Sequence, residues 1–122
     1  MTKNSAKTLE LLFAEIEGKI KNDDPNKSYT AFLAKSGSEN IAKKVVEEAF
    51  ETALASIEGK KHKNGKKQII LESADLFYHL LVLLASQNVK LDQVLEELES
   101  RRQKKNLSKT AIAKNKKKLY GK

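Results

Sequence analysis

The sequence predicts an all-α protein built as a bundle of four main helices. Its 122 residues include only one Pro and five Gly and are rich in Leu, Ala, Glu and Lys, the residues that favour helices. Apolar residues recur at helical spacing in the long segments, and the polar segments between them are short, as in a helical bundle. Cys is absent, which excludes disulfides, thiolate metal sites and a cysteine nucleophile.

The first two helices are predicted from apolar spacing and from end signals. Segment 8–20 places five apolar residues on one helical face, namely Leu9, Leu12, Phe13, Ile16 and Ile20. The polar segment 21–28, which contains Pro25, breaks the chain after it. Ser28 can then cap a short helix, and Gly37 is well placed to end that helix.

The three later helices follow from the same signals. They are expected at 39–58, 67–87 and 91–102. Ser38 is a good N-cap for the first of them, and Gly59 is expected to end it. The segment 59–67, with two Gly and five Lys, is expected to be a loop, and Asn88 can end the long helix that follows.

The net charge of +8 is unevenly spread along the chain. Residues 101–122 contain ten Lys or Arg and no acidic residue, which leaves 14 basic and 16 acidic residues in 1–100. We therefore expect a mildly acidic domain at 1–100 and a basic tail at 101–122. The tail could bind a polyanion such as nucleic acid, or it could be a solubilising end that is disordered or partly helical.

Nothing in the sequence points to secretion or to a membrane. The N-terminal residues have no long apolar segment of the kind found in signal peptides. The longest uninterrupted apolar run, 80–85, is too short to span a bilayer. We expect a cytoplasmic protein.

The helix at 39–58 has an acidic side and an apolar side. At about 100° per residue, Glu47, Glu48 and Glu51 share one sector with Lys44. The opposite side gathers the apolar residues Val46, Phe50, Ala53, Leu54 and Ile57. This pattern alone is typical of an amphipathic helix with a solvated acidic face.

The helix at 67–87 is apolar over most of its circumference, which predicts a central, buried helix. A narrow polar stripe holds Glu72, Asp75, His79 and Ser86. Buried carboxylates are costly unless they are paired, hydrogen-bonded or bound to a metal, and Glu72 and Asp75 are neighbours at i, i+3. Oxygen ligands without Cys favour Mg²⁺, or Mn²⁺, over zinc.

The two acidic helices can be considered together. If they are antiparallel neighbours, Glu48 and Glu51 can face Glu72 and Asp75 across the interface, around one or two metal ions. The alternative is a buried salt-bridge network that includes the lysines at 43 and 44.

These residues resemble a known metal-binding signature. Glu-Glu-x-x-Glu at 47–51, followed by Glu-x-x-Asp at 72–75, is similar to the motif of the all-α MazG-like nucleoside triphosphate pyrophosphohydrolases. The segments "SYTAFL" at 28–33, "IAKKVVEEAFE" at 41–51 and "ESADLFYHLLVLL" at 72–84 resemble the phosphoribosyl-ATP pyrophosphohydrolase family of histidine biosynthesis. The resemblance covers roughly 9–102. Val46 departs from it, because relatives commonly have Gly there, and the lysine-rich loop and basic tail look atypical.

The resemblance implies a reaction, a cofactor and an assembly. The reaction is hydrolysis of phosphoribosyl-ATP to phosphoribosyl-AMP and pyrophosphate with Mg²⁺. The implied metal ligands are Glu48, Glu51, Glu72 and Asp75. Glu47 is a candidate for a second ligand role or for water activation, so that the expected catalytic carboxylates are Glu47, Glu48 and Glu51. The implied fold is a four-helix MazG-like bundle that forms an intertwined homodimer, with the site completed by the partner.

Six residues are candidates for substrate binding, and three of them have a simpler alternative. Lys43 and Lys44 could contact phosphates, but Lys44 could equally pair with Glu48 at i+4. Ser28, Tyr29 and Thr30 could help to bind substrate, although Ser28 could be only a helix cap. His79 could be catalytic or a core histidine with satisfied hydrogen bonds. The lysines of 59–67 could close over phosphates or form a soluble loop.

Two other functions fit parts of the sequence. The same metal motif would serve a house-cleaning pyrophosphatase that acts on canonical or damaged nucleotides. A helical nucleic-acid-binding module would instead use the basic tail and would not need the acidic helices.

Overall fold

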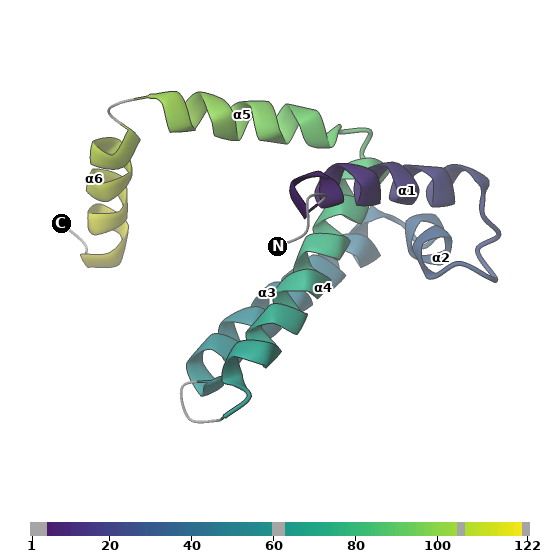
Figure 1. The fold of residues 1–122 in the computed structure, drawn as a ribbon, viewed down its shortest axis with the longest axis horizontal. Helices are drawn as coiled ribbons and strands as arrows, with labels where there is room; N and C mark the ends of the chain where they lie inside the picture. Colours follow the sequence, from purple (N-terminus) through teal and green to yellow (C-terminus); the bar gives the residue numbers. More distant parts are fainter. Residues whose placement is uncertain (1–4, 60–62, 105–106, 121–122) are drawn as a thin grey trace. The chain divides into compact units, whose positions relative to one another are not determined.

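The protein is all-helical over the residues that the structure describes, which are 5–59, 63–104 and 107–120 of a computed structural model. These residues form a short 3₁₀ helix and six α-helices and no strand (Figure 1), so the all-α prediction is confirmed. In chain order they are η1 (Ser5–Lys7), α1 (Thr8–Asn22), α2 (Tyr29–Lys35), α3 (Ser38–Glu58), α4 (Gly65–Ser86), α5 (Leu91–Gln103) and α6 (Leu107–Tyr120).

The chain divides into two compact units. The first is Met1–Leu91 and contains helices α1 to α4; the second is Asp92–Lys122 and contains α6 and nearly all of α5. The division expected at residue 100 rested on charge, whereas this one follows the packing of the backbone.

The first unit is organised around the hairpin of α3 and α4. The two helices lie side by side and antiparallel (Figure 1). Helix α1 packs against α4 and α2, and α2 also contacts α3 and α4. Three side chains that are 0% exposed, Ile16 of α1, Ile41 of α3 and Val82 of α4, form the centre of the core.

Most helix ends lie where the sequence predicted them. Ser28 caps α2, because its Oγ accepts a hydrogen bond from the Ala31 N–H at 3.2 Å. Asn88, just after α4, has a φ of 57°, a left-handed conformation that Asn tolerates and that ends the helix. Helix α4 begins at Gly65, two residues before the expected start, and residues 60–62 of the expected loop lie outside the described residues.

The expected cap of α3 was wrong by one residue. Ser38 is already the first helical residue, and Gly37 occupies the N-cap. The Gly37 carbonyl accepts hydrogen bonds from the N–H groups of Asn40 and Ile41. Gly37 has a φ of 107°, which L side chains rarely adopt, so the glycine itself makes the sharp turn from α2 into α3.

The apolar side of α3 does not face the core of the chain, which corrects the simplest interpretation of its amphipathic pattern. Val46 is 68% exposed, and Phe50 and Ile57 are 66% exposed, whereas Glu48 is only 6% exposed. Helix α3 therefore packs on α4 through its acidic side. The acidic face is not simply solvated, because one of its carboxylates is buried in the interface.

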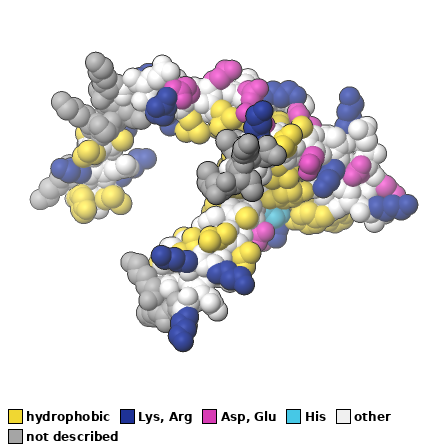
Figure 2. All heavy atoms as spheres, in the orientation of Figure 1, with side chains coloured by type: hydrophobic (Ala, Val, Ile, Leu, Met, Phe, Trp, Pro, Cys, Tyr) yellow, Lys and Arg dark blue, Asp and Glu magenta, His cyan; other side chains and the backbone are white. Residues whose placement is uncertain are grey.

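The sequence predicted that α4 would be central and buried over most of its circumference. Helix α4 is indeed central to the first unit, but part of its apolar surface is exposed. Its side chains Ile70, Leu71, Phe77 and Leu80 are exposed, and Figure 2 shows hydrophobic side chains on the visible surface of the hairpin. The reason is that α1, α2 and α3 cover only part of its circumference. By length and composition α4 would also qualify as a membrane-crossing helix. We interpret it as a core helix, because it packs on α3 and carries Glu72, Asp75 and His79.

Candidate metal centre

Three carboxylates meet across the α3–α4 interface. Glu48 and Glu51 lie one turn apart on α3, and Glu72 lies on α4. One carboxylate oxygen from each residue lies within 4.8 Å of the others. The antiparallel packing of α3 and α4, which the sequence left open as a condition, is what brings these three side chains together.

Two oxygens of this cluster are buried without a donor. Neither Glu48 Oε2 nor Glu72 Oε2 receives a hydrogen bond from any residue that the structure describes. A buried carboxylate oxygen without a partner costs free energy, and three close negative charges repel one another. A divalent cation that prefers oxygen ligands would relieve both penalties, so the donor set fits Mg²⁺ or Mn²⁺.

The pKa of Glu72 reflects burial first and the neighbouring carboxyl groups second. Burial raises the pKa of the Glu72 carboxyl above its usual range, and Glu51, to which a protonated Glu72 can donate, raises it further. The charge of Asp75 adds a smaller increase, while the hydrogen bond from Gln68 acts in the opposite direction. Ionisation of Glu72 beside the other carboxylates therefore lowers the stability of the folded chain.

Gln68 is a residue of the site that the sequence analysis missed. Its Nε2 donates to Glu72 Oε1 at 2.8 Å, which leaves Oε2 without a hydrogen-bond partner among the described residues. The signal was present in the sequence, because Gln68 precedes Glu72 by four residues, the spacing at which helical side chains meet.

Asp75 lies outside the group of three. It is exposed and follows Glu72 by one turn, so it is close enough to influence the pKa of Glu72. Its part in the structure's hydrogen bonding is through the backbone, since its carbonyl accepts from His79 Nδ1 at 2.8 Å. Asp75 stays a predicted fourth ligand.

Lys44 joins the acidic cluster from the same helix. Its Nζ lies 3.4 Å from Glu47 Oε2 and 3.6 Å from Glu48 Oε1. Partial burial lowers the pKa of Lys44, but the hydrogen bond to Glu47 and the charges of Tyr29, Glu47 and Glu48 outweigh it, so the pKa is raised. The alternative of a lysine pairing with the acidic side is thus present for Lys44, but it leaves Glu48 Oε2 and Glu72 Oε2 without partners.

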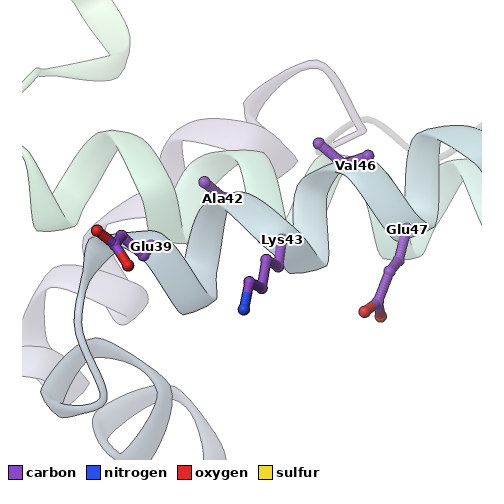
Figure 3. Close-up of a pocket in the computed structure, with 5 residues that line it drawn as sticks. All are labelled: Glu39, Ala42, Lys43, Val46 and Glu47. Atoms are coloured by element: carbon purple, nitrogen blue, oxygen red, sulfur yellow. The ribbon is translucent and has the colours of Figure 1, made fainter.

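Lys43 and Glu47 lie at the outer side of α3. Figure 3 shows Lys43 and Glu47 pointing to the same side of the helix and Glu39 at its N-terminal end, around a shallow surface pocket that Ala42 and Val46 also line. All five residues belong to α3, so the pocket is open surface. The Glu47 side chain is 59% exposed and paired with Lys44, at the rim of the carboxylate cluster.

The residues of the Ser-Tyr-Thr segment have structural partners. Ser28 caps α2, and Thr30, which is 2% exposed, hydrogen-bonds through Oγ1 to the Tyr78 hydroxyl. Tyr78 was not singled out from the sequence. The Tyr29 hydroxyl lies 2.8 Å from Nε2 of His79, and the two rings meet edge to face with centroids 5.8 Å apart.

His79 is buried, 7% exposed, and lies close to the carboxylate of Glu48 and to Tyr29 of α2. Its Nδ1 lies 3.9 Å from Glu48 Oε1, and both ring nitrogens have hydrogen-bond partners. Burial raises the pKa of the Tyr29 phenol; Lys44 lowers it, and Glu48, Tyr78 and Glu47 raise it further. The phenol therefore stays protonated and can donate a hydrogen bond to Nε2 of His79.

The comparisons with known proteins identify the family. Residues 9–102 match the family described as phosphoribosyl-ATP pyrophosphohydrolase. A phosphoribosyl-ATP pyrophosphatase from Pyrobaculum calidifontis is 44% identical over 97 residues, which are 80% of this chain and 97% of the relative. One from Erythrobacter litoralis is 45% identical over 94 residues, 77% of this chain and 85% of the relative.

Some relatives are longer proteins. The histidine biosynthesis bifunctional protein HisIE from Vibrio cholerae is 47% identical over 93 residues, 76% of this chain but only 40% of the relative. The chain thus spans about two fifths of the length of the bifunctional relatives that it matches. The resemblance inferred from the sequence is confirmed: the chain belongs to the phosphoribosyl-ATP pyrophosphohydrolase family, within the all-α MazG-like superfamily.

Proposed function

We propose that the chain hydrolyses phosphoribosyl-ATP to phosphoribosyl-AMP and pyrophosphate, with Mg²⁺ or Mn²⁺ as cofactor. The observation that carries the proposal is the group of Glu48, Glu51 and Glu72, with two buried oxygens that lack donors, in a chain of this family. The names of the relatives place such proteins in histidine biosynthesis, and we propose the same pathway and a cytoplasmic location here.

Each residue of the site has a separate proposed role. Glu48, Glu51 and Glu72 would hold the metal, with Asp75 as a fourth ligand, and Gln68 fixes the orientation of Glu72. When bound, the cation neutralises the triphosphate and orients its phosphates. Glu47, exposed at the rim, is our candidate to accept a proton from the attacking water as pyrophosphate leaves. Lys44 would contact phosphate oxygens when the substrate replaces Glu47 and Glu48 as its partners. Lys43 would make a weaker contact with the phosphates.

We further propose that two chains form a homodimer through their α3–α4 hairpins. On α3, Val46, Phe50, Ala53 and Ile57 are exposed at spacings of four, three and four residues, as in a helical packing seam. On α4, Ile70, Phe77 and Leu80 continue a second such stripe. Two hairpins joined along these stripes would make a four-helix bundle, and each site would then lie beside the partner.

The first experiment is pyrophosphate release from phosphoribosyl-ATP, compared with ATP and dATP, in Mg²⁺ and in EDTA. We expect Mg²⁺-dependent release from phosphoribosyl-ATP that falls at least about 100-fold in Glu51→Gln. Removal of a residue that only hydrogen-bonds to a metal ligand typically costs about 10–100-fold, and removal of the ligand itself should cost more. Release from dATP in preference would assign the same site to house-cleaning of nucleotides. No release from any substrate, with folded protein, would refute the proposal.

A further inference from the structure

Two hydrogen bonds hold α2 against α4 beside the metal cluster. The Tyr29 hydroxyl is bonded to His79 Nε2, and the Thr30 hydroxyl is bonded to that of Tyr78. The rings of Tyr29 and Tyr78 both meet the His79 ring edge to face, with centroids 5.8 Å apart. The hydroxyls of Tyr29 and Thr30, two candidates for substrate binding, are thus engaged in hydrogen bonds within the chain, although the Tyr29 residue is 52% exposed.

The partners of His79 determine which of its nitrogens carries the proton. The Asp75 backbone carbonyl, 2.8 Å from Nδ1, can only accept, so Nδ1 is the N–H donor. In the neutral ring Nε2 is then an acceptor, and the Tyr29 hydroxyl donates to it. Tyr29 and the Asp75 carbonyl therefore select the same tautomer from opposite sides of the ring.

This tautomer matters because of what faces Nδ1. Glu48 Oε1 lies 3.9 Å from Nδ1, so an N–H there is attractive to the carboxylate. In the other tautomer, the Nδ1 lone pair would face both the Asp75 carbonyl and the Glu48 carboxylate, and all three groups are acceptors. Glu48 would then lose the positive side of the ring dipole next to Oε1, while its Oε2 remains the unpartnered ligand atom.

We propose that Tyr29 is a positioning residue that fixes His79 in the Nδ1–H tautomer and thereby holds Glu48 in its metal-binding orientation. The kinetic part of this inference rests on the proposed function, but its structural part does not. In metal sites generally, groups that hydrogen-bond to a ligand from behind set its orientation and affect metal affinity.

The chain offers a matched pair of variants. Tyr29→Phe removes the hydroxyl that bonds to His79, whereas Tyr78→Phe removes a hydroxyl from the same α2–α4 contact without touching the His79 nitrogens. Both variants keep the aromatic ring, so a purely structural effect should be similar in the two. Only Tyr29→Phe should alter the tautomer of His79.

The tautomer can be read from the ring ¹⁵N chemical shifts of His79 at mildly alkaline pH, where an imidazole is neutral. The chain has two histidines, and a His62→Gln variant assigns the signals. In the wild type and in Tyr78→Phe we expect a protonated Nδ1 and an unprotonated Nε2; in Tyr29→Phe we expect a mixture. A protonated Nε2 in the wild type would overturn the proposal.

Metal binding supplies the second readout. Calorimetric titration with Mn²⁺, without substrate, should show affinity about 10-fold weaker in Tyr29→Phe and within about twofold of wild type in Tyr78→Phe. Neither the ¹⁵N spectrum nor this titration depends on the substrate, so an error in the proposed reaction would leave both results standing. Equal metal affinity in all three proteins would overturn the proposal.

A double-mutant comparison tests the route through His79. The Asn amide in His79→Asn can donate from near the Nδ1 position without help from Tyr29. If Tyr29 acts through the tautomer, adding Tyr29→Phe to His79→Asn should not weaken Mn²⁺ binding further. In kinetic assays Tyr29→Phe should raise the Mg²⁺ concentration for half-maximal rate and leave the KM for phosphoribosyl-ATP at saturating Mg²⁺ unchanged. Additive losses, or an effect on substrate KM alone, would instead make Tyr29 a direct substrate contact.

Discussion

Glu48 and Glu72 face each other across the α3–α4 interface, with carboxylate oxygens within 4.8 Å and a buried Oε2 on each that receives no hydrogen bond from the described residues. Such an arrangement is unfavourable in the folded chain alone. A divalent cation held by these oxygens would make it favourable. With the proposed cation bound, the pair would link the stability of the hairpin to metal binding.

Replacement of Glu72 by Gln should stabilise the metal-free protein and abolish activity. The amide removes one negative charge from three close carboxylates while keeping nearly the same volume. Thermal unfolding in EDTA should show a higher Tm for Glu72→Gln than for the wild type, and pyrophosphate release should fall at least about 100-fold. Glu15→Gln, which changes an exposed carboxylate of α1, is the control and should alter neither quantity. A lower Tm for Glu72→Gln would contradict the repulsion argument.

The stability of the metal-free protein should also depend on Glu72 through pH. Because the folded-state pKa of Glu72 is raised, the folded state binds more protons than the unfolded state between the ordinary carboxyl pKa, about 4.3, and the raised value. Stability therefore falls as pH rises through this window. The difference in unfolding free energy between Glu72→Gln and wild type should grow with pH there, and saturating Mg²⁺ should reverse it by stabilising only the wild type. A pH-independent difference would refute this assignment.

The hairpin turn should not tolerate a side chain at Gly65. A Cβ at this position would lie within 2.5 Å of Gly59 Cα and C, atoms of the backbone that cannot easily move. Gly65→Ala should lower the free energy of unfolding by roughly 1–3 kcal/mol, as overpacking does. Gly18→Ala is the matched control, since nothing lies within 4 Å of its new Cβ inside α1, and it should raise stability by up to about 1 kcal/mol. Urea unfolding of both variants measures the two effects.

The exposed stripe of α3 should be the site of chain association. Phe50→Lys places a charge in the proposed seam and should convert dimer to monomer in sedimentation velocity, with helicity retained because Phe50 is 66% exposed in the single chain. Phe32→Lys is the control: Phe32 is 57% exposed but lies on α2, outside the stripes. A dimer that survives Phe50→Lys and dissociates in Phe32→Lys would place the interface elsewhere.

The helices were predictable because they depend on local spacing, whereas the carboxylate cluster was foreseen only on the condition that the two acidic helices are antiparallel neighbours. Periodicity places Glu48 and Glu51 on one side of α3, and an antiparallel hairpin then brings them to Glu72. Periodicity does not say what covers an apolar side, so the exposure of Val46 and Phe77 could not be foreseen from it. Tyr78 was beyond sequence reasoning for another reason, since its partner Thr30 lies 48 residues away.

Deletion of residues 105–122 should leave the activity within about twofold of the full chain, because every residue placed in the site lies in the unit Met1–Leu91. The deletion removes seven of the ten basic residues of 101–122. If these residues bind a polyanion, the full chain should bind single-stranded or double-stranded nucleic acid with an affinity that falls steeply as salt rises. For a duplex, the log of the binding constant should fall against log salt concentration with a slope of about −0.9 per phosphate contact. The deletion should abolish this binding. Glu51→Gln would leave it intact. Loss of pyrophosphate release on deletion, with the remaining chain folded, would instead show that the basic segment contributes to the reaction.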